Sequence, residues 1–397
     1  MTQYWRIAVR SAAGIRQTCP CTTTRPQAHG HLAGDRFIVK LLASPGLNRL
    51  AKYLRPGEAY GAGGGEMVKE NVLSPHGLPV IEAEPGDDLP SWLLINRPTV
   101  DRRMREHGAV LFRGFGLGEH KSFQEAQNAL CETVICGYGD LPEEKGTRQV
   151  YGSTPYPANR EILFHNESSH LSDWPTRQFF ACVIPAEMGG ETPIVDCREV
   201  IRRLDPNLVE ALERRGLLYV RTFIEGLDVS WRDFYKTEDR AAVERICEAS
   251  GDECSWEADG TLQVRRRAQA VAAHPFTGER VFFNQIQLHE PHFLAASVRE
   301  ALLLVYGPDK LPRNVLYGDG EPIEPEALDH ILQVYRRLAV AFPWRSGDML
   351  MLDNMLMAHG RNRFKGARKI IVGLGDPFSR VRQGATQLAD GGALGPA

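Results

Sequence analysis

Short apolar runs alternate with amphipathic stretches from about residue 69 onward, and this pattern predicts one large domain with strands near both of its ends. Strands are predicted at Ala109–Phe115, Arg160–Glu167, Arg177–Ile184, Thr192–Val195, Leu217–Phe223, Gly347–Asn354 and Ala367–Gly373. Helices are predicted at 99–107, 118–136, 198–215, 238–249, 295–306 and 325–341. The arrangement predicts a mainly β fold with α decoration, a double-sheet jelly roll with a large helical insert at about 225–343.

The two ends of the chain differ from this domain, which we place at residues 69–380. Residues 1–34 contain four Arg but no Asp or Glu, and a Gly-rich break follows at 61–65. We expect residues 1–68 to be a poorly ordered or atypical extension, or to precede a true start at Met67. An organellar transit peptide is the less favoured alternative. Residues 381–397 are expected to be a disordered tail.

Composition limits the class of partner. The formal net charge is -3 and no long basic tract occurs, which argues against nucleic acid. No run of about 18 apolar residues is present, so no membrane span is predicted. The eight Cys are scattered without a C-x-x-C pair, as in reduced intracellular proteins, and a cytoplasmic location is expected. A homo-oligomer is left open.

Candidate metal ligands lie at the end of one predicted strand and shortly after another. His165 and Glu167 flank Asn166, and His359 lies far downstream in the run Ala358–Arg361. On an extended strand, residues i and i+2 point the same way, so His165 and Glu167 can meet at one cation. Two imidazoles and a carboxylate form the facial triad of non-haem Fe(II). We therefore predict an iron site completed by His359.

A catalytic zinc uses the same ligand types, His₂Glu with water. The zincin motif, however, places two His at i and i+4 on one helix, with Glu directly after the first. Here His165 and His170 are five apart, and Ser168, Ser169 and Pro175 argue against a helix. Iron is favoured, and a zinc-dependent hydrolase is kept as an alternative.

A second group of residues suits a small dianionic keto acid. Arg368 begins an apolar strand nine residues after His359, and its guanidinium can bind a carboxylate bidentately. Thr192 can add a hydroxyl hydrogen bond. Gly360 and Gly366 are expected to let the ligand and Arg368 approach closely.

Longer motifs cover the chain from about Ala109 to Asp376. They are Phe164–Glu167, Asp173–Pro175, Phe180–Cys182, Pro185–Asp196, Gly216–Arg221, His274–Glu279, Phe283–Gln285, Trp344–Asp348, Leu352–Asn354 and His359–Arg368. Together they resemble the TauD/TfdA family of Fe(II)/2-oxoglutarate-dependent oxygenases. Within it, they are nearest the branch of syringomycin-type amino-acid hydroxylases of peptide natural-product pathways.

The resemblance implies a clavaminate synthase-like double-stranded β-helix that uses Fe(II), 2-oxoglutarate and O₂ and releases succinate and CO₂. His165, Glu167 and His359 match the family's iron ligands. Arg368 and Thr192 match the residues that bind the distal carboxylate of 2-oxoglutarate. Halogenating relatives replace the carboxylate ligand with Ala or Gly, so the presence of Glu167 favours oxygenation.

The expected substrate is an amino acid or a small molecule derived from one, free or tethered to a carrier protein, which is hydroxylated at an unactivated C–H bond in natural-product biosynthesis. Candidate substrate residues are His170, Arg221, Asn284 and Arg361, and Arg221 suits an amino-acid-like carboxylate. A desaturase or cyclase of the same family and a non-catalytic keto-acid-binding relative are further alternatives.

Overall fold

The computed structural model describes residues 70–72, 77–117, 120–136, 141–154, 156–227 and 230–380. The predicted extension at 1–68 and the predicted tail at 381–397 lie outside the described residues. The described residues all lie within the range 69–380, where the sequence analysis placed one domain.

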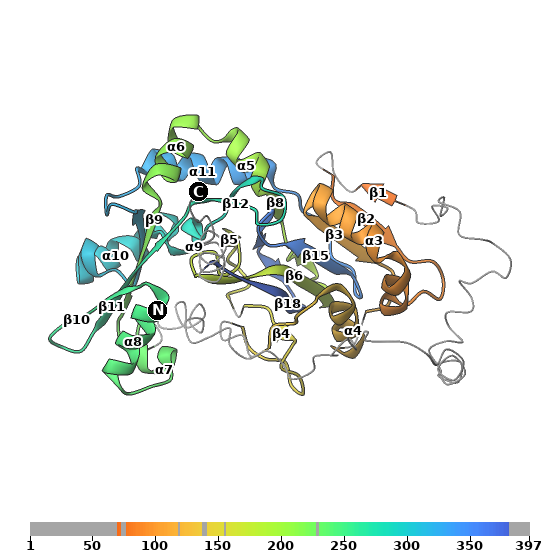
Figure 1. Cartoon of the computed structure of the whole chain (residues 1–397), viewed down its shortest axis with the longest axis horizontal. Coiled ribbons are helices and arrows are strands. Elements are labelled where there is room, and N and C mark those ends of the chain that lie inside the picture. Colours follow the sequence, from red (N-terminus) through yellow and green to blue (C-terminus); the bar gives the residue numbers. More distant parts are fainter. Residues whose placement is uncertain are drawn as a thin grey trace, which may run out of the picture.

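A seven-stranded sheet forms one half of the core (Figure 1). Its order is β1 (Glu70–Val72), β2 (Pro79–Glu82), β3 (Ala109–Arg113), β15 (Met349–Asp353), β6 (Asp173–Ile184), β18 (Lys369–Ser379) and β4 (Tyr151–Gly152). Alternate residues of β6 face opposite sides, as the period of a strand requires. Phe179 packs with the helices on the outer face, whereas Phe180 joins the core between the sheets.

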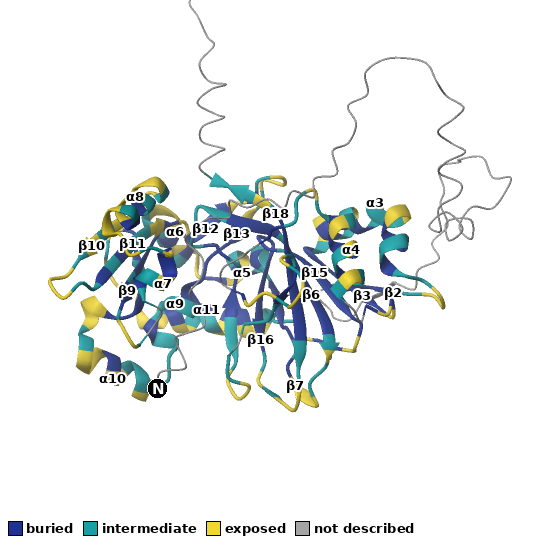
Figure 2. Cartoon of the chain, turned by 90° about the horizontal axis from the view of Figure 1, so that it is seen from below, coloured by how far each residue is buried: buried dark blue, intermediate teal, exposed yellow. Residues whose placement is uncertain are grey.

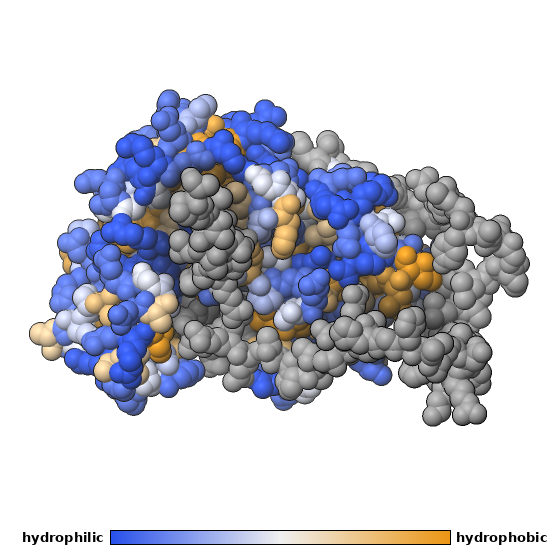
Figure 3. Space-filling view, in the orientation of Figure 1, coloured by the Kyte–Doolittle hydropathy of each residue, from blue (hydrophilic) through white to orange (hydrophobic). Residues whose placement is uncertain are grey.

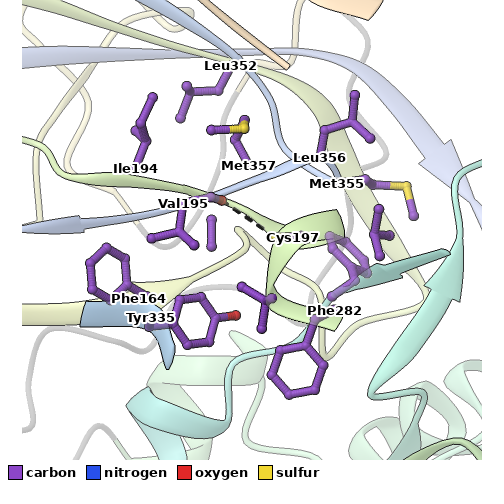
Figure 4. Packing of buried hydrophobic residues seen from close by; sticks show 14 of the residues in the cluster. Phe164, Ile194, Val195, Cys197, Phe282, Tyr335, Leu352, Met355, Leu356 and Met357 are labelled. Carbon is purple, nitrogen blue, oxygen red and sulfur yellow. Dashed lines mark hydrogen bonds between the residues drawn. The ribbon is translucent and has the colours of Figure 1, made fainter. Parts of the chain in front are cut away.

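A smaller sheet lies against the face of the seven-stranded sheet that carries Phe180. It consists of β5 (Ile162–His165), β16 (Met357–Arg361) and β8 (Ile194–Asp196), and β17 (Phe364–Lys365) pairs with β7 (Met188–Gly189) nearby. Figure 4 shows the shared core, in which Phe164 and Tyr335 stack with ring centroids 5.3 Å apart. The two sheets form the double-stranded β-helix that the sequence predicted.

Helices cover the outer faces, and α3 and the pair α5 and α6 differ from the helices predicted from the sequence. They are α3 (Leu89–His107), α4 (His120–Leu130), α5 (Cys197–Arg203), α6 (Pro206–Arg215) and α11 (Pro325–Leu338). Helix α3 begins ten residues earlier than predicted, because the Asp88 side chain caps its first turn and Pro98 is accommodated inside it. The single helix predicted at 198–215 is two helices, because Pro206 has no N–H and starts a new helix behind the cap Asp205.

The insert contains strands that were not predicted, and some of them pair with the predicted strand that precedes it. A four-stranded sheet has the order β10 (Glu253–Trp256), β11 (Leu262–Ala268), β9 (Leu217–Phe223) and β14 (Arg313–Tyr317). Around it lie β12 (Val271–Ala273), β13 (Arg280–Phe282), α7 (Trp231–Tyr235), α8 (Arg240–Ser250), α9 (Ile286–His289) and α10 (Ala296–Tyr306), with 3₁₀ turns at Pro291–Phe293 and Pro308–Lys310. Figure 1 shows β9, β10 and β11 beside the jelly roll, and this region has its own apolar cluster. We call the four-stranded sheet β10-β11-β9-β14 the outer sheet.

Burial follows the layers. Figure 2 shows buried residues running along β6, β15 and β18, with exposed residues on the outer turns of α3 and α8. The face seen in Figure 3 is mostly hydrophilic, and the large exposed apolar side chains include Leu304 on α10 and Leu94 on α3. Within the described ranges, no helix has the length and apolar character needed to cross a membrane.

Candidate active site

His165, Glu167 and His359 converge, although almost 200 residues separate the first two from the third. His165 is the last residue of β5 and lies directly opposite His359 on β16, with ring centroids 4.3 Å apart. One ligand atom from each of the three side chains lies within 4.8 Å of the others. Among the described residues, this is the one group of His, Cys, Asp or Glu side chains that meets this geometry.

The strand predicted through Glu167 was wrong. Strand β5 ends at His165, and Glu167 stands in the following turn, where Ser168 has a left-handed φ of 56°. The carboxylate therefore reaches His165 through a turn and not through the period of an extended strand. A turn lacks the regular hydrogen bonds of a strand, so the position of the Glu167 side chain depends on contacts with other segments.

Asn354, which the sequence analysis did not single out, holds this turn. Its Oδ1 accepts a hydrogen bond from the Glu167 backbone N–H at 2.7 Å. Its Nδ2 donates to the backbone oxygens of Glu167 and Pro175, each at 2.9 Å. In return, the buried Asn166 side chain donates to the Asn354 carbonyl at 2.7 Å. The Leu352–Asn354 motif could have indicated this role. It ends in polar residues, which the packing of an apolar strand does not explain.

The surroundings of His165 and His359 favour their neutral form, which is the form that binds a metal. The Nδ1 of His165 lies 2.9 Å from the Leu163 carbonyl, which favours a proton on Nδ1 and leaves the Nε2 lone pair available. Burial lowers the pKa of His165 to about 4, although this hydrogen bond opposes the shift. Burial likewise holds the pKa of His359 well below its usual value, and its Nδ1 has no hydrogen-bond partner among the described residues. Neutral imidazoles and a carboxylate fit a divalent metal such as Fe(II).

An inner pocket of about 50 Å³ adjoins the three ligands and is lined by Thr192 and Arg368. The Arg368 Nε donates to the Gly190 carbonyl at 2.9 Å, and Gly190 has a φ of +76°. A Cβ on Gly190 would lie 3.0 Å from the Arg368 Cδ, so glycine makes room for the side chain. Burial, followed by the charge of Arg361, lowers the pKa of Arg368 to about 10, which leaves the guanidinium charged at neutral pH.

The Thr192 hydroxyl is oriented by a second side chain. Trp344 donates from Nε1 to Thr192 Oγ1 at 3.3 Å, and both residues are buried. Because the indole N–H occupies an acceptor position of the hydroxyl, the hydroxyl proton is left to donate elsewhere. A cation and a hydroxyl donor in one small pocket suit a carboxylate.

Gly360, which lines the inner pocket, and Gly366 also make close contacts within the chain. A Cβ on Gly360 would lie 2.7 Å from the Ile162 carbonyl oxygen, and one on Gly366 would lie 2.5 Å from the Glu187 Cδ. Both glycines therefore relieve contacts within the chain, and their expected role beside a ligand stays a prediction.

A larger outer pocket of about 140 Å³ opens on the other side of His165 and Glu167. His170 and Arg221, both predicted as substrate residues, line it. Its wall also contains His289 of α9. From the outer sheet it contains three residues that the sequence analysis did not predict as substrate-binding residues: Tyr219, Arg266 and Arg313. The metal ligands thus lie between a small cationic pocket and a larger cavity.

The two other predicted substrate residues are engaged with the chain. Asn284 lines neither pocket, and its Oδ1 accepts from the Ile286 N–H at 3.2 Å. Arg361 lines the inner pocket, but its guanidinium donates to the carbonyls of Tyr156, Pro157 and Arg160 at 2.7–2.9 Å. Arg361 therefore fixes the segment before β5.

Comparisons with known proteins find similarity over most of the chain. The chain is 36% identical over 279 residues to the dapdiamide synthesis protein DdaC of Enterobacter agglomerans, which covers 70% of this chain and 85% of DdaC. It is 29% identical over 297 residues to a clavaminate synthase-like protein of Arabidopsis thaliana, which covers 69% and 83% of the two chains. Among solved structures, PvcB of Pseudomonas aeruginosa aligns with a TM-score of 0.49 and 16% identity, over 82% of this chain and 98% of PvcB.

One family model matches most of the chain. It is described as taurine catabolism dioxygenase TauD, TfdA family, and it matches residues 72–374, which include all three candidate metal ligands and Arg368. The chain therefore belongs to the TauD/TfdA family and is an Fe(II)- and 2-oxoglutarate-dependent oxygenase.

Proposed function

We propose that this enzyme hydroxylates an unactivated C–H bond of an amino acid or of a small molecule derived from one, in natural-product biosynthesis. His165, Glu167 and His359 would hold Fe(II), and Arg368 with Thr192 would bind the distal carboxylate of 2-oxoglutarate. The observation that carries the proposal is the convergence of these three ligand side chains between two pockets, of which the smaller is cationic.

The chain's residues have separate tasks in this reaction. When bound, Fe(II) and 2-oxoglutarate supply the oxidising chemistry, in which O₂ is consumed and succinate and CO₂ are released. Arg368 and Thr192 orient the cosubstrate from its far end, so that its keto-acid end faces the metal ligands. The buried walls of the inner pocket, which include Phe180 and Ile370, exclude water from this end.

The outer pocket would hold the carbon that reacts. It shares His165 and Glu167 with the metal site, so a substrate bound there lies beside the metal. Arg221 and His170 supply polar contacts for an amino-acid-like molecule, as expected from the sequence. The similarity to DdaC, a dapdiamide synthesis protein, supports a biosynthetic role.

The test measures succinate formed and 2-oxoglutarate consumed together, and it requires no knowledge of the substrate. Purified protein is incubated in air with 2-oxoglutarate and either Fe(II) or Zn(II), and succinate and the remaining 2-oxoglutarate are quantified. We expect slow succinate formation with Fe(II), matched one to one by loss of 2-oxoglutarate, and none with Zn(II). Hydrolytic activity that Zn(II) restores without succinate would contradict the proposal and favour the zinc alternative.

A further inference from the structure

We propose that Gln178 is a further residue of the cosubstrate site, and that its side-chain amide donates a hydrogen bond to the keto-acid carboxylate of 2-oxoglutarate. This carboxylate is at the opposite end of the molecule from the one assigned to Arg368. The inference rests on the proposed function, because it concerns what occupies the inner pocket of that oxygenase. It adds a residue that binds the reacting half of the cosubstrate and that the sequence analysis did not single out.

The side chain of Gln178 is a buried amide to which the chain supplies no hydrogen bond. Only 1% of the residue is exposed, and it lines the inner pocket. Its Oε1 has no hydrogen-bond partner, and no side-chain hydrogen bond joins Gln178 to the described part of the chain. Burial of an amide without a hydrogen bond costs free energy, so its presence at this position needs an explanation.

The neighbours of Gln178 in the sheet make this amide an exception. Gln178 pairs with Leu352 on β15 and with Leu374 on β18, and both leucines are fully buried. Thr176 lies two residues earlier on the same face of β6, and its hydroxyl donates to the Asp376 carbonyl at 2.8 Å. An apolar residue at position 178 would continue the core layer, so packing does not explain the amide.

The order of residues along β6 places Gln178 and Arg368 at opposite ends of the inner pocket. Alternate residues of a strand face the same side and lie about 7 Å apart. The register of β6 with β18 puts Arg368, which precedes β18, just beyond Cys182. Phe180 is the next residue of this row, and its ring centroid lies 5.0 Å from that of His359. Gln178 follows Phe180 on the side away from Arg368.

The turn that carries Glu167 lies at the same end as Gln178. Gln178 is opposite Leu352, and Asn354, which holds this turn, follows two residues later. The Asn354 backbone N–H donates to the Thr176 carbonyl at 2.9 Å, which joins this segment to β6. Both Gln178 and Glu167 line the inner pocket. The amide therefore stands at the end of the pocket where the metal ligands lie.

The chemistry of 2-oxoglutarate fits this arrangement. It has a carboxylate at each end, and Arg368 with Thr192 meets the distal one in the proposed function. A keto-acid carboxylate that chelates a metal through one oxygen keeps a second oxygen that accepts hydrogen bonds. A neutral amide can donate there without the repulsion that a second cation would experience beside Fe(II). Because a half-turn of the amide exchanges its oxygen and nitrogen, either position can present the NH₂ group.

The experiment compares two keto acids that differ in the distal carboxylate. 2-Oxobutyrate has the same keto-acid group as 2-oxoglutarate but no carboxylate at the other end. A keto acid chelated to Fe(II) absorbs visible light, so anaerobic titration of the Fe(II)-loaded protein gives Kd for each compound. The affinity for Fe(II) alone is measured first. In Gln178→Leu we expect Kd to rise about tenfold or more for both keto acids.

Two further variants locate the contact. Arg368→Met should give the complementary pattern, with a higher Kd for 2-oxoglutarate and little change for 2-oxobutyrate, which lacks the group that Arg368 binds. Gln178→Glu keeps the shape of the side chain but replaces the donor with a carboxylate. We expect Gln178→Glu to raise Kd for both keto acids at least as much as Gln178→Leu does, because like charges then face each other.

The unfolding temperature separates a binding role from a structural one. Gln178→Leu should not lower Tm of the ligand-free protein, because leucine removes an unpaired buried amide. Gln127→Leu is the matched control. Gln127 is also fully buried, but its Nε2 donates to the Leu374 carbonyl at 2.9 Å, and it lines neither pocket. We expect this control to lower Tm and to leave both Kd values unchanged.

The outcomes separate this inference from the proposed function. Unchanged Kd values in both Gln178 variants would overturn the inference. So would a weaker binding of 2-oxoglutarate alone, or a loss of Fe(II) affinity that accounts for the whole effect. If wild-type protein binds 2-oxoglutarate with Fe(II) and the Gln178 variants do so equally well, only the role of Gln178 fails. A wild-type protein that binds neither keto acid would overturn both.

Discussion

The inner and outer pockets share His165 and Glu167, but they are built in different ways. The inner pocket lies between the sheets of the jelly roll, and most of its ligand-binding side chains come from segments with compact motifs, such as His359–Arg368. The outer pocket is closed by the outer sheet, and two of its charged residues, Arg266 and Arg313, come from strands that carry none of these motifs. In the proposed function, the inner pocket serves the metal and the cosubstrate, and the outer pocket serves the substrate.

The largest expected effect comes from removing a metal ligand that the two pockets share. In Glu167→Ala we expect succinate formation to fall about 1,000-fold or more, because the metal contributes several kcal/mol to catalysis. The measurement is succinate production at saturating Fe(II) and 2-oxoglutarate. Glu161→Ala is the matched control, because Glu161 lies in the same segment but pairs with Arg336 at the surface. Equal activity of Glu167→Ala and the control would refute the ligand assignment.

The second effect separates the cosubstrate from the metal. In Arg368→Met we expect the 2-oxoglutarate concentration at half-maximal rate to rise about 100-fold, because a charge-assisted contact of about 2–3 kcal/mol is lost. The rate at saturation should change much less. Arg345→Met serves as the control, because it removes an arginine that is exposed at the surface. An unchanged 2-oxoglutarate requirement in Arg368→Met would exclude its role at the distal carboxylate.

A third prediction concerns the turn that carries Glu167. Asn354→Ala removes the three side-chain hydrogen bonds to Glu167 and Pro175, so we expect the affinity for Fe(II) to fall about 10–100-fold. The Fe(II) dependence of succinate formation measures this, with Tm recorded in parallel. Asn314→Ala on the outer sheet should leave the affinity for Fe(II) unchanged. If both variants bind Fe(II) like the wild type, Asn354 does not position the ligand.

The smallest effect is a pH dependence of the metal-free protein. Burial holds the pKa of His165 at about 4 in the folded state, whereas a free imidazole titrates near 6.5. Between these values the unfolded chain binds the additional proton, so the free energy of unfolding decreases as pH falls from about 6.5 to 4. In His165→Gln we expect this slope to be smaller by up to about 1.4 kcal/mol per pH unit. Urea unfolding across this range is the measurement, and identical slopes would contradict the shift.

The sequence predicted the jelly roll and the candidate ligands because their signals are local. Apolar runs marked the strands that became β6 and β15, and His165 and Arg368 stand in motifs of fixed spacing. It could not predict that Glu167 lies in a turn, because the hydrogen bonds that shape the turn come from Asn354, almost 200 residues away.

The outer pocket was less predictable for the same physical reason. Arg221 was identified, but its Cα partner Arg313 on β14 is 92 positions further along the chain, and only the register of β9 with β14 brings them together. Asn284, which stands in a motif, lies outside both pockets. Pairing between distant strands depends on the packing of the whole sheet, and one strand's composition does not report it.

Anaerobic titration of the Fe(II)-loaded protein with 2-oxoglutarate is the most direct test of the central assignment. A keto acid that chelates Fe(II) through two oxygens gives a visible charge-transfer absorption, which reports metal and cosubstrate together. We predict that the wild-type protein develops this absorption and saturates at one 2-oxoglutarate per chain, and that His359→Ala does not. An equally intense absorption in His359→Ala, or none in wild-type protein that has bound Fe(II), would contradict the account.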